Sequence, residues 1–243
     1  ADRGEIDYVN SEKVSNTDYV RVLREYSESG VDLIVGEAFG ISAEARKVAD
    51  DYPNIAYLMG DPGSGYGGTC FPKDIEALIQ LGKENDYLPK IISSVNQVNK
   101  VQKKLFLNKI LKKFGNDLSG LKFAIWGLSF KPETNDMRKA PSIYIIKELV
   151  KRNATISAYD PKANKEAQDV FLKGVEVIYG NNKYEIVKNA DALILLTEWK
   201  EFRLPDFNKI KRIMKNNIIF DGRNQFSNLN LLQKGFEYYQ IGK

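Results

Sequence analysis

The stretch KFAIWGLSFKPETNDMRKAPSIYIIKELVKRNATISAYDP, residues 122–161, decides the fold that we expect for this chain. It opens with a short apolar run that is typical of a buried strand, and residues 155–161 form a second such run. Between them, the pattern over residues 141–153 predicts a helix. A strand, a helix and a strand in this order indicate a β-α-β unit of a parallel sheet.

The same alternation continues toward the C-terminus. Residues 175–180, 190–199 and 216–223 predict further strands, with helical stretches between them. This predicts an α/β fold in which residues 117–243 form a doubly wound, Rossmann-like parallel sheet. Ligands of such sheets bind outside the carboxyl ends of the strands, so the candidate binding loops are GLSFKPETNDMR, YDPKAN, LTEWKEF and DGRN.

Toward the N-terminus, residues 62–116 predict a helical central domain. The segment FPKDIEALIQLGKEN, residues 71–85, has a helical pattern with Pro72 at an early position, where its missing N–H costs nothing. A longer helix over residues 87–115 is expected to bridge two domains. Its apolar residues near helical spacing are Ile91, Ile92, Val95, Val98, Val101, Leu105 and Ile110.

Residues 1–61 predict a short β-α-β fragment that precedes the central domain. Strand-like and helix-like segments alternate, and each helical pattern ends at a glycine or just before a proline. The strand-like segments are residues 5–11, 31–39 and 54–60, and the helix-like segments are residues 17–30 and 41–53.

Composition excludes several classes of protein. The 243 residues are 43% hydrophobic and 28% charged, and the net charge of +4 is spread over lysine-rich helical stretches, so we expect no nucleic-acid partner. No apolar run is long enough to span a bilayer, and the first residues lack the pattern of a signal peptide, which predicts a cytoplasmic protein without a membrane partner. The absence of histidine excludes Ser-His and Cys-His nucleophiles and histidine metal sites, and we expect no metal.

The stretch DPGSGYGGTCFPKD, residues 61–74, matches the spacing G-x-G-x-x-G at Gly63, Gly65 and Gly68. A pyrophosphate-binding turn needs its third glycine in the first turn of the helix, whereas the helix here is expected to begin at Pro72. The glycines therefore serve a different purpose, which the neighbouring cysteine suggests.

Cys70 is the only cysteine of the chain and lies at the predicted start of this helix. A helix N-terminus and the nearby charge of Lys73 favour a thiolate, while Gly67 and Gly68 are expected to leave the adjacent backbone open to a substrate. A lone cysteine is also commonly a small buried hydrophobe, and glycine clusters are commonly turns. The spacing alone leaves both interpretations open.

Longer strings resolve the choice. GYGGTCFPKD (65–74), GLSFKPETNDMRKAPS (127–142), TEWKEFR (197–203) and FDGRN (220–224) resemble, in order and spacing, segments of the UDP-glucose/GDP-mannose dehydrogenase family. The resemblance covers residues 62–243, the central and UDP-binding domains. It implies an NAD-dependent oxidoreductase of polysaccharide biosynthesis that oxidises UDP-glucose to UDP-glucuronate. UDP-glucose is preferred over GDP-mannose because CFPKD follows GYGG.

The resemblance also implies roles for single residues. Cys70 would form a thiohemiacetal and then a thioester with C6 of the sugar, Asp74 would position or activate the hydrolytic water, and Lys73 would belong to the same catalytic loop. Arg138 would contact the phosphates of NAD. The substrate-binding residues would be Gly67, Gly68, Phe71, Phe130, Lys131 and Arg223, the last acting across domains or subunits.

For the basic residues the alternative is a solvated surface charge; we favour a functional role for Lys131, Arg138 and Arg223 and leave Arg203 undecided. Arginine and lysine at strand ends suit a diphosphate because their charges make short, strong hydrogen bonds to phosphate oxygens.

The N-terminal part departs from the family pattern. Residues 7–60 resemble part of a basic membrane lipoprotein family of periplasmic nucleoside-binding proteins, and we place the junction near residues 60–62. The sequence therefore predicts a chain without the NAD-binding domain. We expect this chain to bind the nucleotide sugar as a homodimer and to be nearly inactive alone. The alternatives are a nucleoside-binding transport module and an inactive dimerising fragment joined through the helix of residues 88–114.

Overall fold

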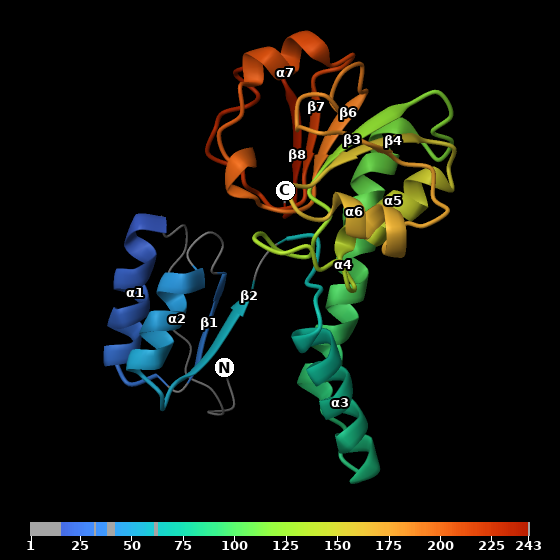
Figure 1. Cartoon of the computed structure of the whole chain (residues 1–243). Coiled ribbons are helices and arrows are strands. Elements are labelled where there is room, and N and C mark those ends of the chain that lie inside the picture. The colour runs from blue at the N-terminus through green and yellow to red at the C-terminus, as the bar shows by residue number, and fades with distance from the viewer. Residues whose placement is uncertain (1–15, 32, 38–41, 61–62, 243) are drawn as a thin grey trace. The chain divides into compact units, whose positions relative to one another are not determined.

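The computed structural model describes residues 16–31, 33–37, 42–60 and 63–242, and it divides into two compact units, residues 1–61 and 62–243 (Figure 1). Of the segments predicted above, the strand at residues 5–11 lies outside the described residues.

The first unit contains two helices and a two-stranded parallel sheet. Helix α1 (Asn16–Glu28) precedes strand β1 (Leu33–Glu37), and helix α2 (Ser42–Asp51) precedes strand β2 (Ala56–Gly60). Among its described side chains, Leu23, Ile34 and Val48 form a buried apolar core. The described elements follow one another in the order α1, β1, α2 and β2.

The second unit contains a parallel sheet with strand order β5-β4-β3-β6-β7-β8. In chain order this is 3-2-1-4-5-6, the order of doubly wound dinucleotide-binding folds, so the predicted fold class is confirmed. The strands are β3 (Lys122–Trp126), β4 (Thr155–Tyr159), β5 (Ile178–Tyr179), β6 (Ala192–Leu195), β7 (Ile218–Asp221) and β8 (Glu237–Gln240). The sequence analysis missed β8, whose EYYQ sequence is only partly buried and lacks an apolar run.

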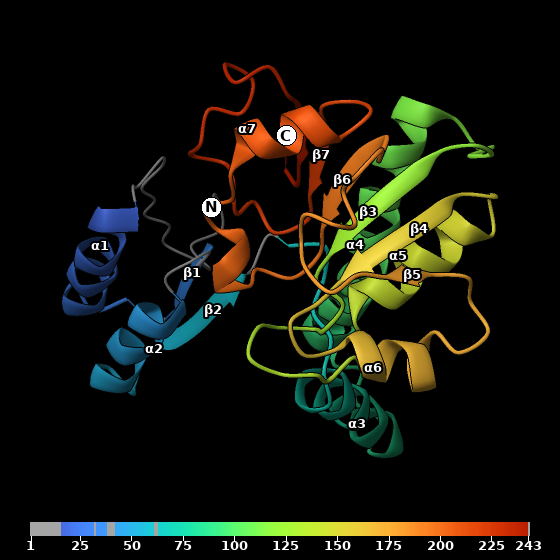
Figure 2. The same ribbon diagram turned by 45° about the horizontal axis from the view of Figure 1, so that its top comes forward.

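Helices cover both faces of this sheet, as Figures 1 and 2 show. Phe123 and Ile125 of β3 pack with α4 and α5, whereas Ala124 and Trp126 pack on the opposite face. This alternation follows from the two-residue period of a strand. The helical elements are α3 (Cys70–Glu84), α4 (Lys90–Phe114), α5 (Pro141–Val150), α6 (Asn164–Glu166), a π-helical turn (Ala167–Phe171), a 3-10 turn (Lys200–Phe202) and α7 (Phe207–Ile213).

Helix α4 has two distinct halves. Phe106, Leu107 and Ile110 in its C-terminal half are buried in the core beside the sheet. Its N-terminal half extends away from the sheet together with α3 (Figure 1). The predicted long helix therefore joins the helical hairpin to the sheet domain.

The carboxyl ends of the central strands lie in one row. Trp126 is in register with Tyr159 and Leu195, and Leu195 is in register with Asp221. The loops that follow β3, β4, β6 and β7 therefore start side by side, which is the arrangement that places a ligand site at this edge.

Candidate active site

Cys70 is the first residue of α3, and its side chain is exposed. The helix begins two residues before the predicted start at Pro72, which is buried in the first turn, where a missing N–H breaks no helical hydrogen bond. The Cys70 Sγ lies 3.9 Å from the Thr69 Oγ1. The structure therefore has the thiol at a helix N-terminus, as expected, and not in an apolar interior.

The glycines before Cys70 pack against the loop that follows β3. The Gly68 N–H donates to the Arg138 carbonyl at 2.7 Å. A Cβ on Gly68 would lie 2.7 Å from the Phe130 ring, and a Cβ on Gly67 would lie 2.7 Å from the Lys139 carbonyl oxygen. The expected open backbone at Gly67 and Gly68 is thus corrected: both are buried, because the two loops approach at a distance that only glycine permits.

The residues that follow Cys70 lie on the exposed first turns of α3. Lys73 and Asp74 form an ion pair at 3.4 Å, with side chains 76% and 58% exposed. Asp74 follows Cys70 by four residues, so both share one face of the helix. Phe71 is also exposed and meets the ring of Tyr66 edge to face, with 6.1 Å between the ring centroids.

Phe130 and Lys131 lie together in the loop after β3. The Phe130 ring is partly buried against the core, and the Lys131 Nζ lies 5.3 Å from its centroid. The Lys131 side chain is exposed. This pair presents an aromatic edge and a positive charge at the carboxyl end of the sheet.

Arg223 is buried in this structure. Its Nη2 donates to the Phe130 carbonyl at 2.9 Å, its Nε donates to the Leu196 carbonyl at 3.1 Å, and Nε lies 2.9 Å from the Glu198 carboxylate. The expected contact of Arg223 with a substrate across domains or subunits stays a prediction. Within the chain, Arg223 ties together the loops after β3, β6 and β7.

Arg138 is paired within its own loop. Its Nε and Nη2 donate to the two carboxylate oxygens of Asp136, each at 2.9 Å. The hydrogen bond to Asp136 raises the pKa of Arg138. The guanidinium predicted to bind cofactor phosphates is thus engaged by a carboxylate, although its side chain is 58% exposed.

Asp160 directly follows β4 and bonds residues of the loops after β3 and β6 at the carboxyl end of the sheet. The sequence analysis did not predict it. Its Oδ2 accepts from the Leu128 N–H at 2.7 Å, the Ser129 N–H at 3.1 Å and the Trp199 Nε1 at 3.0 Å, and its Oδ1 accepts from the Lys162 N–H. The signal for it was an aspartate directly after a buried strand, in the loop YDPKAN.

Asn99 and Lys103 of α4 were also missed. The Asn99 side-chain amide bonds both backbone groups of Tyr66, and the Lys103 Nζ donates to the Lys139 carbonyl. Their spacing of four residues places both side chains on one helix face, which is the pattern that could have revealed them.

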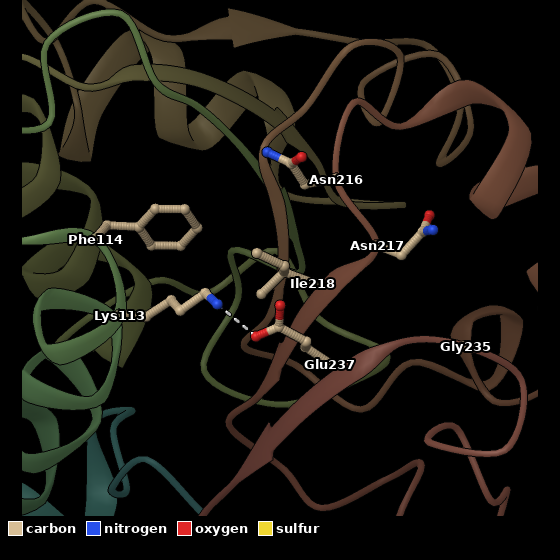
Figure 3. Close-up of a pocket in the computed structure, with 7 residues that line it drawn as sticks. All are labelled: Lys113, Phe114, Asn216, Asn217, Ile218, Gly235 and Glu237. Atoms are coloured by element: carbon tan, nitrogen blue, oxygen red, sulfur yellow. Dashed lines mark hydrogen bonds and ion pairs between the residues drawn. The ribbon is translucent and has the colours of Figure 1, made fainter.

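A separate hollow of about 460 Å³ opens at the opposite edge of the sheet, near the amino ends of β7 and β8 (Figure 3). An ion pair of 2.6 Å between Lys113 and Glu237 crosses it. Its lining residues are Lys113, Phe114, Asn216, Asn217, Ile218, Gly235 and Glu237. None of the predicted site residues lines it, so it is distinct from the candidate active site.

Neither a metal-binding cluster nor a membrane-spanning helix is found among the described residues. In that part of the chain, no three His, Cys, Asp or Glu side chains gather in a way that could hold a metal ion. No helix there has both the length and the apolar character needed to cross a bilayer.

Comparisons with known proteins identify the family. The model of the UDP-glucose/GDP-mannose dehydrogenase family, UDP binding domain, matches residues 124–228, and the central-domain model of that family matches residues 35–101. The resemblance of residues 7–60 to a nucleoside-binding family gains no support from these matches, since the central-domain match begins within that segment.

Curated relatives include two bacterial enzymes. The UDP-glucose 6-dehydrogenase of Pseudomonas aeruginosa is 38% identical over 184 residues, which cover 74% of this chain and 41% of the relative. The UDP-glucose 6-dehydrogenase YwqF of Bacillus subtilis is 38% identical over 213 residues, which cover 84% of this chain and 48% of the relative. The chain therefore spans less than half the length of these relatives.

Solved structures with the same fold include two archaeal proteins. A UDP-glucose dehydrogenase from Pyrobaculum islandicum has a TM-score of 0.63 at 22% identity, and the match covers 93% of this chain and 49% of that protein. An NDP-N-acetyl-D-galactosaminuronic acid dehydrogenase from Methanosarcina mazei has a TM-score of 0.63 at 24% identity, and the match covers 94% and 48%. At these identities the likeness shows the fold alone.

Proposed function

The chain belongs to the UDP-glucose/GDP-mannose dehydrogenase family, a family of oxidoreductases, and from this we propose that it carries the nucleotide-sugar site and the reactive thiol of an NAD-dependent UDP-glucose 6-dehydrogenase. One observation supports this most strongly. The Gly68 N–H bonds the Arg138 carbonyl, which ties the loop that bears Cys70 to the loop that bears Phe130 and Lys131.

In this proposal the loop after β3 binds the nucleotide sugar. The exposed Lys131 supplies a positive charge for the diphosphate, and the partly buried Phe130 supplies an apolar edge. Charge-assisted hydrogen bonds to phosphate oxygens are short and strong, so one lysine at a strand end is well suited to this ligand. Arg223 orients the Phe130 backbone through its hydrogen bond to the Phe130 carbonyl and needs no direct contact with the substrate.

Cys70 performs the covalent chemistry. Its thiolate adds to the C6 aldehyde carbon to form the alkoxide of a thiohemiacetal, which becomes a thioester when a hydride leaves C6. Water then attacks the thioester carbon, the C–S bond breaks, and the thiolate and the carboxylate product are released. Asp74, on the same face of α3, accepts the proton of that water, and Arg138 places positive charge beside the sulfur.

The described residues fit one part of the cofactor. Arg138 has an exposed guanidinium close to Cys70, and a phosphate there would share it with Asp136. NAD, when bound, supplies the acceptor for the two hydrides that leave C6.

Calorimetry and a turnover assay test this function. The 243-residue chain is expected to bind UDP-glucose and not a purine nucleoside, and Cys70→Ser is expected to bind UDP-glucose equally well. Failure to bind UDP-glucose would contradict the assignment. Steady NADH formation from UDP-glucose that Cys70→Ser abolishes would contradict the expected inactivity of the chain alone.

A homodimer joined through α4 completes the proposal. Ile91, Val98 and Leu105 recur at seven-residue intervals on α4, and their side chains are 75%, 59% and 50% exposed; Val101 lies between the last two and is also exposed. A heptad stripe of this kind suits packing against the same helix of a second copy. Leu78 and Leu81 of α3 are exposed as well.

A further inference from the structure

We infer that Asn99 and Lys103 are positioning residues that hold the cysteine loop, residues 63–70, against the segment Arg138–Ala140. The inference rests on the function proposed above and assigns to α4 a task beyond joining domains. It concerns the geometry between the thiol and the nucleotide-sugar loop, to which α4 adds side-chain contacts beside the direct bond from Gly68 to Arg138.

Asn99 holds the middle of the cysteine loop. Its Oδ1 accepts from the Tyr66 N–H at 2.8 Å, and its Nδ2 donates to the Tyr66 carbonyl at 3.2 Å. One side chain thus satisfies both backbone groups of a residue that lies four positions before Cys70. At Gly65, where φ is +110°, a Cβ would lie 2.7 Å from the Asn99 Oδ1. The backbone at Gly65 therefore lies so close to the Asn99 side chain that only glycine fits at position 65.

Lys103 lies one helical turn after Asn99 and reaches the other partner. Its Nζ donates to the Lys139 carbonyl at 3.1 Å, and its Cε lies 3.5 Å from the position of a Cβ on Gly65. Burial, and secondarily the charge of Lys139, lowers the pKa of Lys103. The Lys103 side chain therefore lies between the two segments. Its methylene chain lies near Gly65 of the cysteine loop, and its ammonium group bonds the Arg138–Ala140 segment.

Two backbone hydrogen bonds hold the cysteine loop on either side of Tyr66. The Ser64 N–H donates to the Gly222 carbonyl at 2.8 Å, and the Gly68 N–H donates to the Arg138 carbonyl at 2.7 Å. Asn99 supplies the anchor between them. Loss of Asn99 is thus expected to loosen the loop between its two ends, whereas Phe106 and Ile110 still hold α4 in the core.

The experiment uses Cys70 as a single-site reporter, since the chain has no other cysteine. We would measure the alkylation rate of Cys70 by iodoacetamide against pH, without ligand and with UDP-glucose, in Asn99→Ala and Lys103→Met. Because the loop holds Cys70 at the N-terminus of α3, a loosened loop is expected to change the alkylation profile of Cys70. At neutral pH the rate should fall roughly threefold to tenfold, the effect of a lost hydrogen bond.

Asn96→Ala is the matched control. Asn96 is on the same helix, is also partly buried, and makes no side-chain hydrogen bond in the described structure. Asn96→Ala should retain the wild-type alkylation profile. The unfolding midpoints of Asn99→Ala and Lys103→Met should differ from wild type by no more than that of Asn96→Ala does. A wild-type alkylation profile in Asn99→Ala and Lys103→Met would overturn the inference.

The ligand arm separates the two proposals. If UDP-glucose fails to protect wild-type Cys70, the proposed function fails, while the ligand-free profiles still decide the positioning role. If UDP-glucose protects wild-type Cys70 and protects Asn99→Ala less, both stand. Equal protection together with a wild-type profile in the variant would leave the function intact and refute the positioning role.

Discussion

Gly68 links the reactive thiol to the nucleotide-sugar loop through its backbone alone. Its φ of +83° and its distance from the Phe130 ring exclude a side chain. Glycine here is therefore explained by packing between two loops and not by a phosphate, although the spacing G-x-G-x-x-G in the sequence is typical of phosphate-binding turns. The spacing of the glycines thus matches a phosphate-binding motif, whereas contacts between two loops explain the glycine at position 68.

The first prediction concerns this glycine. Gly174, with φ of +78° and nothing within 4 Å of the position that a Cβ would take, is the control, and Gly174→Ala should cost about 1 kcal/mol of unfolding free energy for the backbone alone. Gly68→Ala should cost about 1–3 kcal/mol more, because its Cβ would overlap the Phe130 ring. Urea denaturation measures both, and equal losses in the two variants would refute the packing argument.

A second prediction concerns Asp136 and pH. The hydrogen bond from Arg138, the largest cause, holds the pKa of Asp136 below its usual value. The ion pair therefore stabilises the fold above the unfolded-state pKa of the carboxyl, and this contribution is lost as pH falls through the lower folded-state pKa. Asp136→Asn should be less stable than wild type at neutral pH, by a small margin because Arg138 is exposed, and equally stable in strong acid.

Urea denaturation at neutral and acidic pH measures this difference. Asp169→Asn is the control, since Asp169 is exposed and makes no ion pair within the described residues. A deficit in Asp136→Asn that stays constant with pH would show that the ion pair is not its cause.

At the scale of elements, α4 combines three tasks along one helix. Its C-terminal half is buried beside the sheet, the face with Asn99 and Lys103 contacts the cysteine loop, and the stripe with Ile91 and Val98 is exposed. A helix can divide its surface in this way because residues at different positions of the 3.6-residue period point in different directions.

The third prediction tests the exposed stripe. Val98→Glu places a charge in the centre of the proposed helix-to-helix contact, and burial of one such side chain contributes about 1.5–3 kcal/mol. We expect light scattering to show a weaker dimer, with a dissociation constant raised at least roughly tenfold. Lys100→Glu, at an exposed polar position of the same helix, is the control. A monomeric wild-type chain, or a Val98→Glu variant that dimerises normally, would contradict the dimer.

At the scale of the molecule, the core and the candidate site of the second unit belong to the same compact body. This unit has a large apolar cluster on each face of its sheet. The candidate site, from Cys70 to Arg223, lies within residues 62–243. The second unit therefore contains both its own core and every predicted site residue.

The fourth prediction follows from this division. Residues 62–243 alone are expected to unfold in one cooperative transition and to bind UDP-glucose with the affinity of the whole chain. Thermal unfolding and calorimetry on this fragment provide the measurement, with the 243-residue chain as the reference. A fragment that folds but binds at least tenfold more weakly would show that residues 1–61 contribute to the site.

The sequence by itself determined the α/β class, most of the strands and helices, the helix N-terminus at Cys70 and the family. These depend on short-range periodicity, turn residues and an ordered string of motifs, all of which are local in the chain. The short strand β8 escaped, because its residues are only half-buried and show no clear period.

Only the tertiary structure decided what the individual site residues touch. Gly68 faces Phe130, Arg223 is buried among carbonyl groups, and Asn99 bonds Tyr66 across 33 residues of sequence. Such contacts join segments far apart in the chain, so no local pattern encodes which donor meets which acceptor. The partners are chosen when the carboxyl ends of the strands align and bring their loops together at one edge of the sheet.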